Sequence, residues 1–178
     1  MDAATTIFKQ DSRRLAAMPS VAVLFLTLTL THLSHAQQLG IRSRDKDQQL
    51  IHDLFHAEQY FKEVQWDIHN SFQHQGVAVV WTAGSFHMSG SRSAQLNQAD
   101  TGLAVRIQNS GPQDAWKIAQ ATDFTDVARG DHSAMVSAVS NQLSEATFGI
   151  TVMFRKDANS TSAAGTYETL LTGTITAP

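Results

Sequence analysis

The spacing of hydrophobic residues changes near residue 63, which predicts two different kinds of structure. Between Arg44 and Glu63 the sequence is charged and lacks glycine, and its apolar residues recur at spacings of four and three. This is the period of an amphipathic helix. We therefore expect residues 37–63 to form a helical or disordered N-terminal extension.

From residue 64 onward, apolar and polar residues alternate, as they do in strands with one buried face. The alternating runs cover residues 64–68, 77–81, 86–88, 103–107, 116–118, 135–139, 148–154 and 167–175. Turn-forming residues such as glycine, serine and asparagine separate the runs. Short strands joined by turns predict an all-β fold, an antiparallel sandwich over residues 64–178.

The first 36 residues have the three parts of a secretory signal peptide. Three basic residues lie between positions 9 and 14, an apolar run of about 16 residues extends from Met18 to Leu33, and small residues at Ser34 and Ala36 predict cleavage before Gln37. The run is shorter than the roughly 20 residues of a spanning helix. No second run of that length follows, so we expect an exported chain with no membrane span after signal removal.

Charge and cysteine content narrow the range of partners. The formal net charge is −3, and removal of three basic and two acidic residues with the signal changes it to about −4. A chain without a basic stripe is not expected to bind nucleic acid. It contains no cysteine, so its stability has to come from a packed core, or from another chain that completes one.

Candidate catalytic and metal-binding residues are few. His52 and His56 would share one face of a helix and could hold zinc, but Asp53 stands where metalloproteases have glutamate, and spacing identifies no third ligand. We interpret both histidines as polar residues flanking a buried edge. Three aspartates between positions 123 and 131 lack the glycine and terminal glutamate of a calcium loop. Neither an enzyme nor a cofactor is expected.

Two stretches resemble the cysteine-free pilins of the chaperone–usher pathway, of the Caf, Saf, Sef and Psa/Myf kind. The first is the end of the chain, where an apolar strand, Phe148–Phe154, is followed by a polar loop, a small residue and glycine, an aromatic residue and a threonine-rich last strand. The second is the stretch Ala115–Ala119, which is similar to a tryptophan–basic–aliphatic strand of these pilins. Together they cover about a third of the mature chain.

The resemblance implies an immunoglobulin-like sandwich whose last strand has an open edge. In that family a periplasmic chaperone covers the edge, and the N-terminal extension of the next subunit later replaces it. The groove would be lined by Phe148, Ile150, Val152 and Phe154, beside Tyr167, Leu171 and Ile175.

The donated segment is less well defined by the sequence. Alternation within the extension would make it Leu50, His52, Leu54 and His56, although the helical period fits this segment better. Either the segment becomes a strand on insertion, or the chain is a tip or specialised subunit that donates nothing. Ala177 also departs from the aromatic residue that many such subunits have at this position.

The expected function is that of a structural or adhesive subunit of a surface fimbria. Its partners would be neighbouring pilin subunits, the periplasmic chaperone, the outer-membrane usher and a host receptor, on a route through the periplasm to the cell surface. Two alternatives stay open: a monomeric secreted β-sandwich that binds a ligand, and a zinc hydrolase using His52 and His56.

Overall fold

The computed structural model describes residues 39–50, 57–70, 76–89, 98–111, 114–156 and 166–177. Within these residues the chain forms antiparallel strands and one short 3-10 turn, η1 (Val127–Arg129), with no α-helix. No described helix is long and apolar enough to cross a bilayer. The expected all-β sandwich is confirmed. The expected signal peptide, residues 1–36, lies outside the described residues.

The described residues contain twelve strands. In chain order they are β1 (Leu39–Ser43), β2 (Glu58–Tyr60), β3 (Val64–Asn70), β4 (Val77–Gly84), β5 (Phe86–Met88), β6 (Gln98–Ser110), β7 (Trp116–Gln120), β8 (Thr122–Phe124), β9 (Ser133–Ser140), β10 (Ser144–Arg155), β11 (Tyr167–Glu168) and β12 (Leu171–Thr176).

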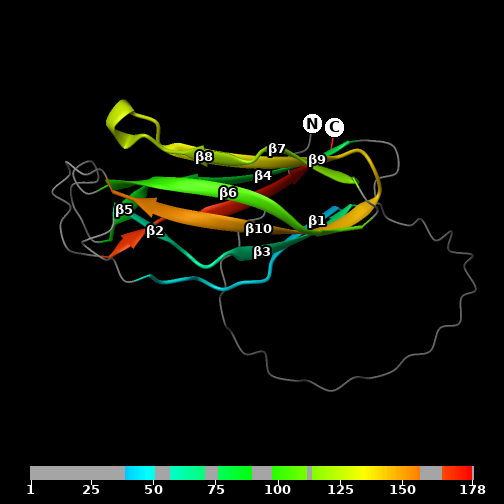
Figure 1. Cartoon of the computed structure of the whole chain (residues 1–178), viewed down its shortest axis with the longest axis horizontal. Helices are drawn as coiled ribbons and strands as arrows, with labels where there is room; N and C mark the ends of the chain where they lie inside the picture. The colour runs from blue at the N-terminus through cyan, green and yellow to red at the C-terminus, as the bar shows by residue number, and fades with distance from the viewer. Residues whose placement is uncertain are drawn as a thin grey trace, which may run out of the picture.

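The strands form two sheets that pack face to face (Figure 1). The first sheet has the order β1-β3-β10-β6-β5-β11, with β2 also pairing with β10, and β8 with β6. The second has the order β12-β4-β9-β7. The central strand of the first sheet is β10, in which Ile150 pairs with Val64 on one side and Val105 on the other.

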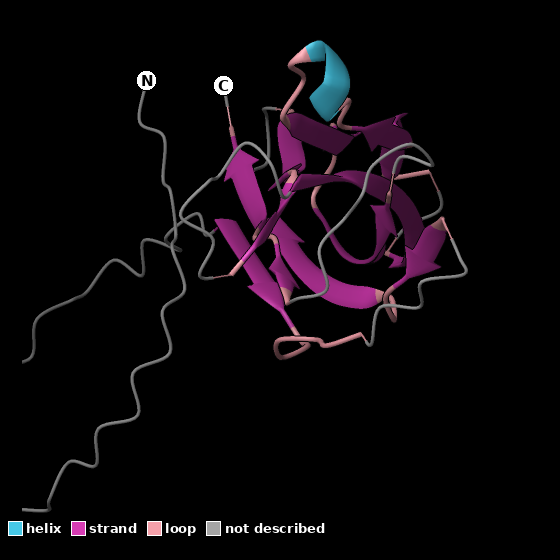
Figure 2. Cartoon of the chain, turned by 90° about the vertical axis from the view of Figure 1, so that its left-hand side faces the viewer, coloured by secondary structure: helices cyan, strands magenta, loops and turns pink. Residues whose placement is uncertain are grey.

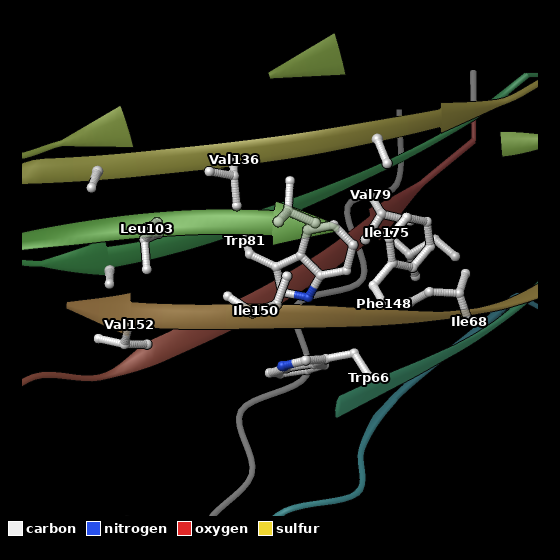
Figure 3. Close-up of a cluster of buried hydrophobic side chains, with 14 of the residues drawn as sticks. Trp66, Ile68, Val79, Trp81, Leu103, Val136, Phe148, Ile150, Val152 and Ile175 are labelled. Atoms are coloured by element: carbon white, nitrogen blue, oxygen red, sulfur yellow. The ribbon is translucent and has the colours of Figure 1, made fainter. Parts of the chain in front are cut away.

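The core forms where the inward positions of the two sheets meet (Figure 3). Trp81 of β4 and Phe148 of β10 are both fully buried, with ring centroids 5.0 Å apart. Trp116 of β7 approaches the Phe148 ring edge-on at 5.4 Å. Each such side chain contributes about 2–3 kcal/mol by leaving water, so the core is built on the alternating residues that predicted the strands.

The expected strands are found, with differences at the ends of the chain. The run predicted over residues 167–175 is two strands, because β11 pairs with β5 whereas β12 pairs with β4. The helix expected over Arg44–Glu63 is not present in the described parts of that segment, where residues 44–50 form no regular element and β2 pairs with β10. Phe61 stacks on Phe86 at 5.8 Å, so core packing decides this conformation rather than helical spacing.

Part of the strand order corresponds to that of an immunoglobulin domain without its last strand, whereas β9 and β7 extend the second sheet beyond β4, and β5 and β11 extend the first beyond β6. Constant-type domains have strands A, B, E and D in one sheet and G, F and C in the other. The order β1-β3-β10-β6 corresponds to A-B-E-D, and β12-β4 corresponds to F-C. Among the described residues no strand lies in the position of G, on the far side of β12.

Candidate functional site

One side of the sandwich, between β1 and β12, is not closed by main-chain hydrogen bonds; we call this side the open seam. The end-on view in Figure 2 shows the two layers from which it is formed. β12 pairs through all six of its residues with β4 alone, and β1 pairs through all five with β3 alone. In the described part of the chain, each strand has one edge without a neighbour. A row of main-chain donors and acceptors on such an edge is a template for another strand.

Two side chains fill the floor of the open seam. A Cβ placed on Gly173 of β12 would lie 2.7 Å from Ile41 Cδ1 and 2.7 Å from a ring carbon of Trp66. Trp66 is buried, and Ile41 is half-buried. Because a Cβ does not fit at such distances, glycine at 173 is what allows β1 and β3 to pack so closely on β12.

The opposite side of the sandwich is closed by the chain itself. β7 of the second sheet continues after one residue into β8 of the first. At this crossing the amide of Val105 donates a hydrogen bond to the carbonyl of Ala121 at 2.9 Å. The two sides of the sandwich are therefore different, and a strand added to the second sheet beside β12 would enter at the open seam.

The predicted groove residues occupy both layers of the sandwich rather than one groove wall. Phe148, Ile150, Val152 and Phe154 point into the core from β10, which has neighbours along both edges. The expectation that β12 lies beside this strand is corrected, because β12 belongs to the opposite sheet.

The remaining predicted groove residues lie near the end of the chain. In β12, Ile175 is buried, whereas Leu171 is half-buried against the core. Tyr167 is in β11, and its ring meets that of Phe154 at 5.5 Å. These residues, together with those of β10, surround the core that a strand at the open seam would cover.

The predicted donor and metal residues fall mostly outside the described residues. His52, Leu54 and His56 lie there, whereas Leu50 is described and is 42% exposed. The described residues contain no group of three histidine or acidic side chains that could hold a metal ion.

The aspartates between positions 123 and 131 hold their own loop in place. Asp123 accepts a hydrogen bond from the amide of Met135 at 2.8 Å, and Asp126 caps the amide of Arg129 at 3.2 Å. The amide of Asp126 also donates to the carbonyl of Asp131 at 2.9 Å. These contacts give the three aspartates a structural role in the loop.

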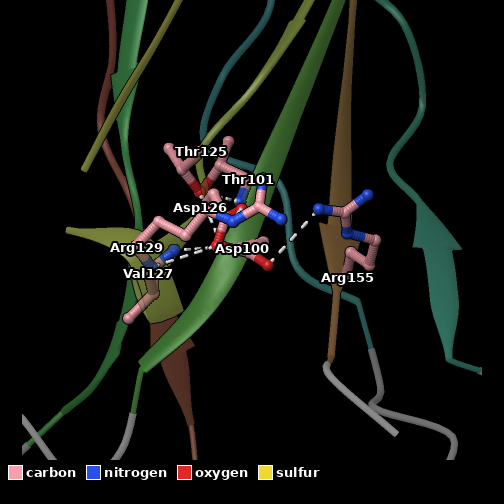
Figure 4. A network of polar contacts seen from close by, with 7 residues as sticks. All are labelled: Asp100, Thr101, Thr125, Asp126, Val127, Arg129 and Arg155. Carbon is pink, nitrogen blue, oxygen red and sulfur yellow. Dashed lines mark hydrogen bonds and ion pairs between the residues drawn. The ribbon is translucent and has the colours of Figure 1, made fainter. Parts of the chain in front are cut away.

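A second polar network fixes the same loop to the first sheet (Figure 4). One carboxylate oxygen of Asp100 accepts from the amide of Val127 at 2.8 Å and from the hydroxyl of Thr125 at 3.2 Å. Its other oxygen lies 3.4 Å from the Arg155 guanidinium, which also sits 5.2 Å from the centre of the Phe124 ring. Each of these groups has a structural partner, so the network stabilises β8 and η1.

Glu63 and Asp67 each accept hydrogen bonds from an arginine on the outer face of the first sheet. Glu63 accepts hydrogen bonds from Arg106 and Gln108, and the Arg106 hydrogen bond holds the pKa of Glu63 below its ordinary value, against an opposing effect of burial. Asp67 is paired with Arg44 at 2.6 Å, and this hydrogen bond, again opposed by burial, lowers the pKa of Asp67. The second pair ties the end of β1 to β3.

The outer face of the second sheet is almost without charge. Its outward residues on β4, β9 and β12 are Ala78, Val80, Thr82, Met135, Ser137, Val139, Thr172, Thr174 and Thr176. The adjacent edge strand β7 adds Lys117, opposite Val139. Next to the open seam, then, the molecule has an uncharged sheet face and a free strand edge.

No protein-family model, curated protein or solved structure matches this chain. Sequence reasoning had identified Leu171 and Ile175 on the free strand, but it assigned no role to Ile41 or Gly173. Glycine inside a threonine-rich strand is a signal for close approach of another segment, and it could have identified position 173. Ile41 had no such signal, because its strand, Leu39–Ser43, is too short to show a period.

Proposed function

We propose that this chain is a structural or adhesive subunit of a surface fimbria, assembled by donor-strand exchange. The observation that carries the proposal is the free edge of β12, which borders the core at the place where an immunoglobulin domain has strand G. The sequence resemblance to cysteine-free chaperone–usher pilins supports the same reading. Such a subunit would be exported and would reach the cell surface through the periplasm.

Strand addition fits the chemistry of this edge. An incoming strand would gain main-chain hydrogen bonds from β12, and every second side chain would face the core. Its inward side chains would meet Leu171 and Ile175 of β12 and Trp66 from the opposite sheet. Affinity would then come from the main chain, and selectivity from the apolar positions that the strand fills.

The proposed partners are those that would cover the unpaired edge of β12 at each stage of export and assembly. A long unpaired edge over an apolar core promotes aggregation. A periplasmic chaperone would cover it during export, the outer-membrane usher would exchange that cover for the N-terminal segment of a neighbouring subunit, and a host receptor would meet the exposed surface.

A denaturing gel of the cell-surface protein, run with and without boiling, tests this function. Strand-exchanged polymers are kinetically stable, so we expect a ladder in the unboiled lane and one band after boiling. A monomer band in both lanes would contradict the proposal.

A monomer band in both lanes would favour the second candidate, a secreted monomeric module that binds a ligand. One observation supports this candidate: β1 of the same chain already covers part of the open seam through Ile41. The boiled and unboiled lanes therefore separate a fibre subunit from a self-contained domain.

A further inference from the structure

We propose that β1 is an exchangeable strand: in the free subunit it closes the open seam of its own chain, and on assembly it moves to the β12 edge of a second copy. The inference rests on the proposed function and adds to it how the space over Gly173 is kept filled until the strands exchange. It also names the donated segment as Leu39–Ser43.

The position of β1 suits a removable cover. It is a five-residue strand at the edge of its sheet, held along one side by β3. Its two large apolar side chains, Leu39 and Ile41, pack against the core but are only half-buried. Ile41 reaches across the open seam to Gly173. The cover therefore rests on side-chain packing against β12, because the described residues of the two strands share no main-chain hydrogen bond.

One movement would prepare both halves of the exchange. While Ile41 occupies the space over Gly173, an inward side chain of an incoming strand has no room there, because even a Cβ on Gly173 would lie only 2.7 Å from Ile41 Cδ1. When β1 leaves, this space opens and the same strand becomes available to a neighbour. Donation and acceptance are thus coupled, and a subunit that holds its own β1 does neither.

The contacts after β1 supply a hinge for this movement. The amide of Arg44 donates to the carbonyl of Gln65 at 2.8 Å, and Asp45 accepts from the amide of Gln65 at 2.6 Å. Arg44 is also paired with Asp67. These contacts lie beyond Ser43, so β1 can swing about its end and reach about 17 Å as an extended strand.

Burial supplies the driving force. Moving a strand from one copy to another replaces one set of main-chain hydrogen bonds by a similar set, which makes such exchanges inexpensive. A strand on the β12 edge would extend the second sheet at the open seam. Leu39 and Ile41, which are half-buried on the β3 edge, would then face the buried Trp66 of the other layer, and additional apolar surface would leave water.

Engineered disulfides test whether β1 has to leave. The chain has no cysteine, so each double variant carries only its own pair. In Gly40→Cys/His69→Cys the pair joins β1 to β3, because the Cβ of residue 40 would lie 3.6 Å from that of His69, a distance suited to a disulfide. We expect the oxidised mature protein to stay monomeric on an unboiled gel and to assemble after addition of dithiothreitol.

The matched control is Val80→Cys/Ser137→Cys, which joins β4 to β9 on the outer face, away from β1. Oxidised, it should assemble like the unmodified protein. If the oxidised Gly40→Cys/His69→Cys protein also assembles at the unmodified rate, β1 does not need to leave and the inference is overturned while the fibre function stands. If no version assembles, the proposed function fails and this inference fails with it.

A single substitution tests the cover itself. In Ile41→Ala the contact over Gly173 is lost, so the initial rate of assembly should rise about tenfold, the factor that corresponds to 1.4 kcal/mol. The assembled ladder should also melt at a lower temperature, because the same side chain is missing after exchange. Arg42→Ala, on the exposed face of β1, is the control and should change neither quantity. An Ile41→Ala protein that assembles no faster than the control would refute the cover.

Discussion

Gly149 and Glu63 should behave as an energetically coupled pair, because the side chain of one occupies the space above the other. A Cβ on Gly149 would lie 2.5 Å from both carboxylate oxygens of Glu63, and the three atoms nearest to it all belong to that carboxyl group. Glu63 is only 21% exposed and accepts hydrogen bonds from Arg106 at 2.5 and 3.0 Å. In Gly149→Ala the new methyl group therefore has to displace the carboxylate from its partners.

The change in the free energy of unfolding caused by Gly149→Ala follows from three effects. Arg106 is 69% exposed, so loss of its pair with Glu63 costs only about 1 kcal/mol. Displacement of a packed side chain adds about 1 kcal/mol of strain. Replacing glycine by alanine in a strand stabilises the folded state by about 0.5 kcal/mol, because the unfolded chain has less conformational entropy. Gly149→Ala alone should thus destabilise by about 1.5 kcal/mol, whereas in a Glu63→Ala background it should stabilise by about 0.5 kcal/mol.

Urea unfolding monitored by tryptophan fluorescence, applied to the two single variants and the double variant, measures this coupling as a thermodynamic cycle. Gly40→Ala is the matched control on the same face, because its nearest neighbour would be at an ordinary contact distance of 3.6 Å. Equal effects of Gly149→Ala in both backgrounds would show that the carboxylate does not occupy this space, and the reasoning would be refuted.

Three further changes have defined outcomes. The contribution of the Glu63 and Asp67 ion pairs to the free energy of unfolding should be fully present above the ordinary pKa range of carboxylates, about pH 4. It should be lost as the pH drops through the lowered pKa values of these two groups. Thermal melts of Glu63→Gln across this pH range should show a smaller loss of stability. Asp100→Ala removes the acceptor of the Val127 amide and should cost about 1–3 kcal/mol, with faster hydrogen exchange at that amide. Trp81→Ala empties a fully buried position and should cost about 3–5 kcal/mol in urea unfolding, whereas a loss below 1 kcal/mol would contradict the core described above.

The alternation of apolar and polar residues along the sequence was sufficient to predict the central strands of the fold. The runs around Trp81 and Phe148 became β4 and β10, because a strand with one buried face has to alternate. The pattern could not assign each strand to a sheet, since inward residues of both sheets alternate alike. For this reason Ile175 was expected beside β10 but lies in the opposite layer.

The N-terminal segment shows where a local period misleads. Leu50, Ala57 and Phe61 have helical spacing, yet Phe61 stacks on Phe86 and residues 58–60 pair with β10. Tertiary contacts of this kind outweigh helix propensity, which amounts to less than 1 kcal/mol per residue. The strand that carries Ile41 is too short to show a period at all, so the part of the candidate site that it contributes could not be read from the sequence.

The two sides of the sandwich differ in what would have to be broken to open them. On the side of β7 and β8 the chain passes from one sheet to the other, so separating the layers means breaking hydrogen bonds within both sheets. At the open seam, parting β1 from β12 means removing half-buried side chains from a glycine, and no main-chain hydrogen bond to β12 is lost. Opening free energies vary across a protein and are smallest where few buried contacts hold a segment. To leave, β1 also has to break its five-residue pairing with β3, the one strand it is paired with among the described residues. A segment that leaves and returns as a unit is therefore expected at β1, next to the edge that could accept it.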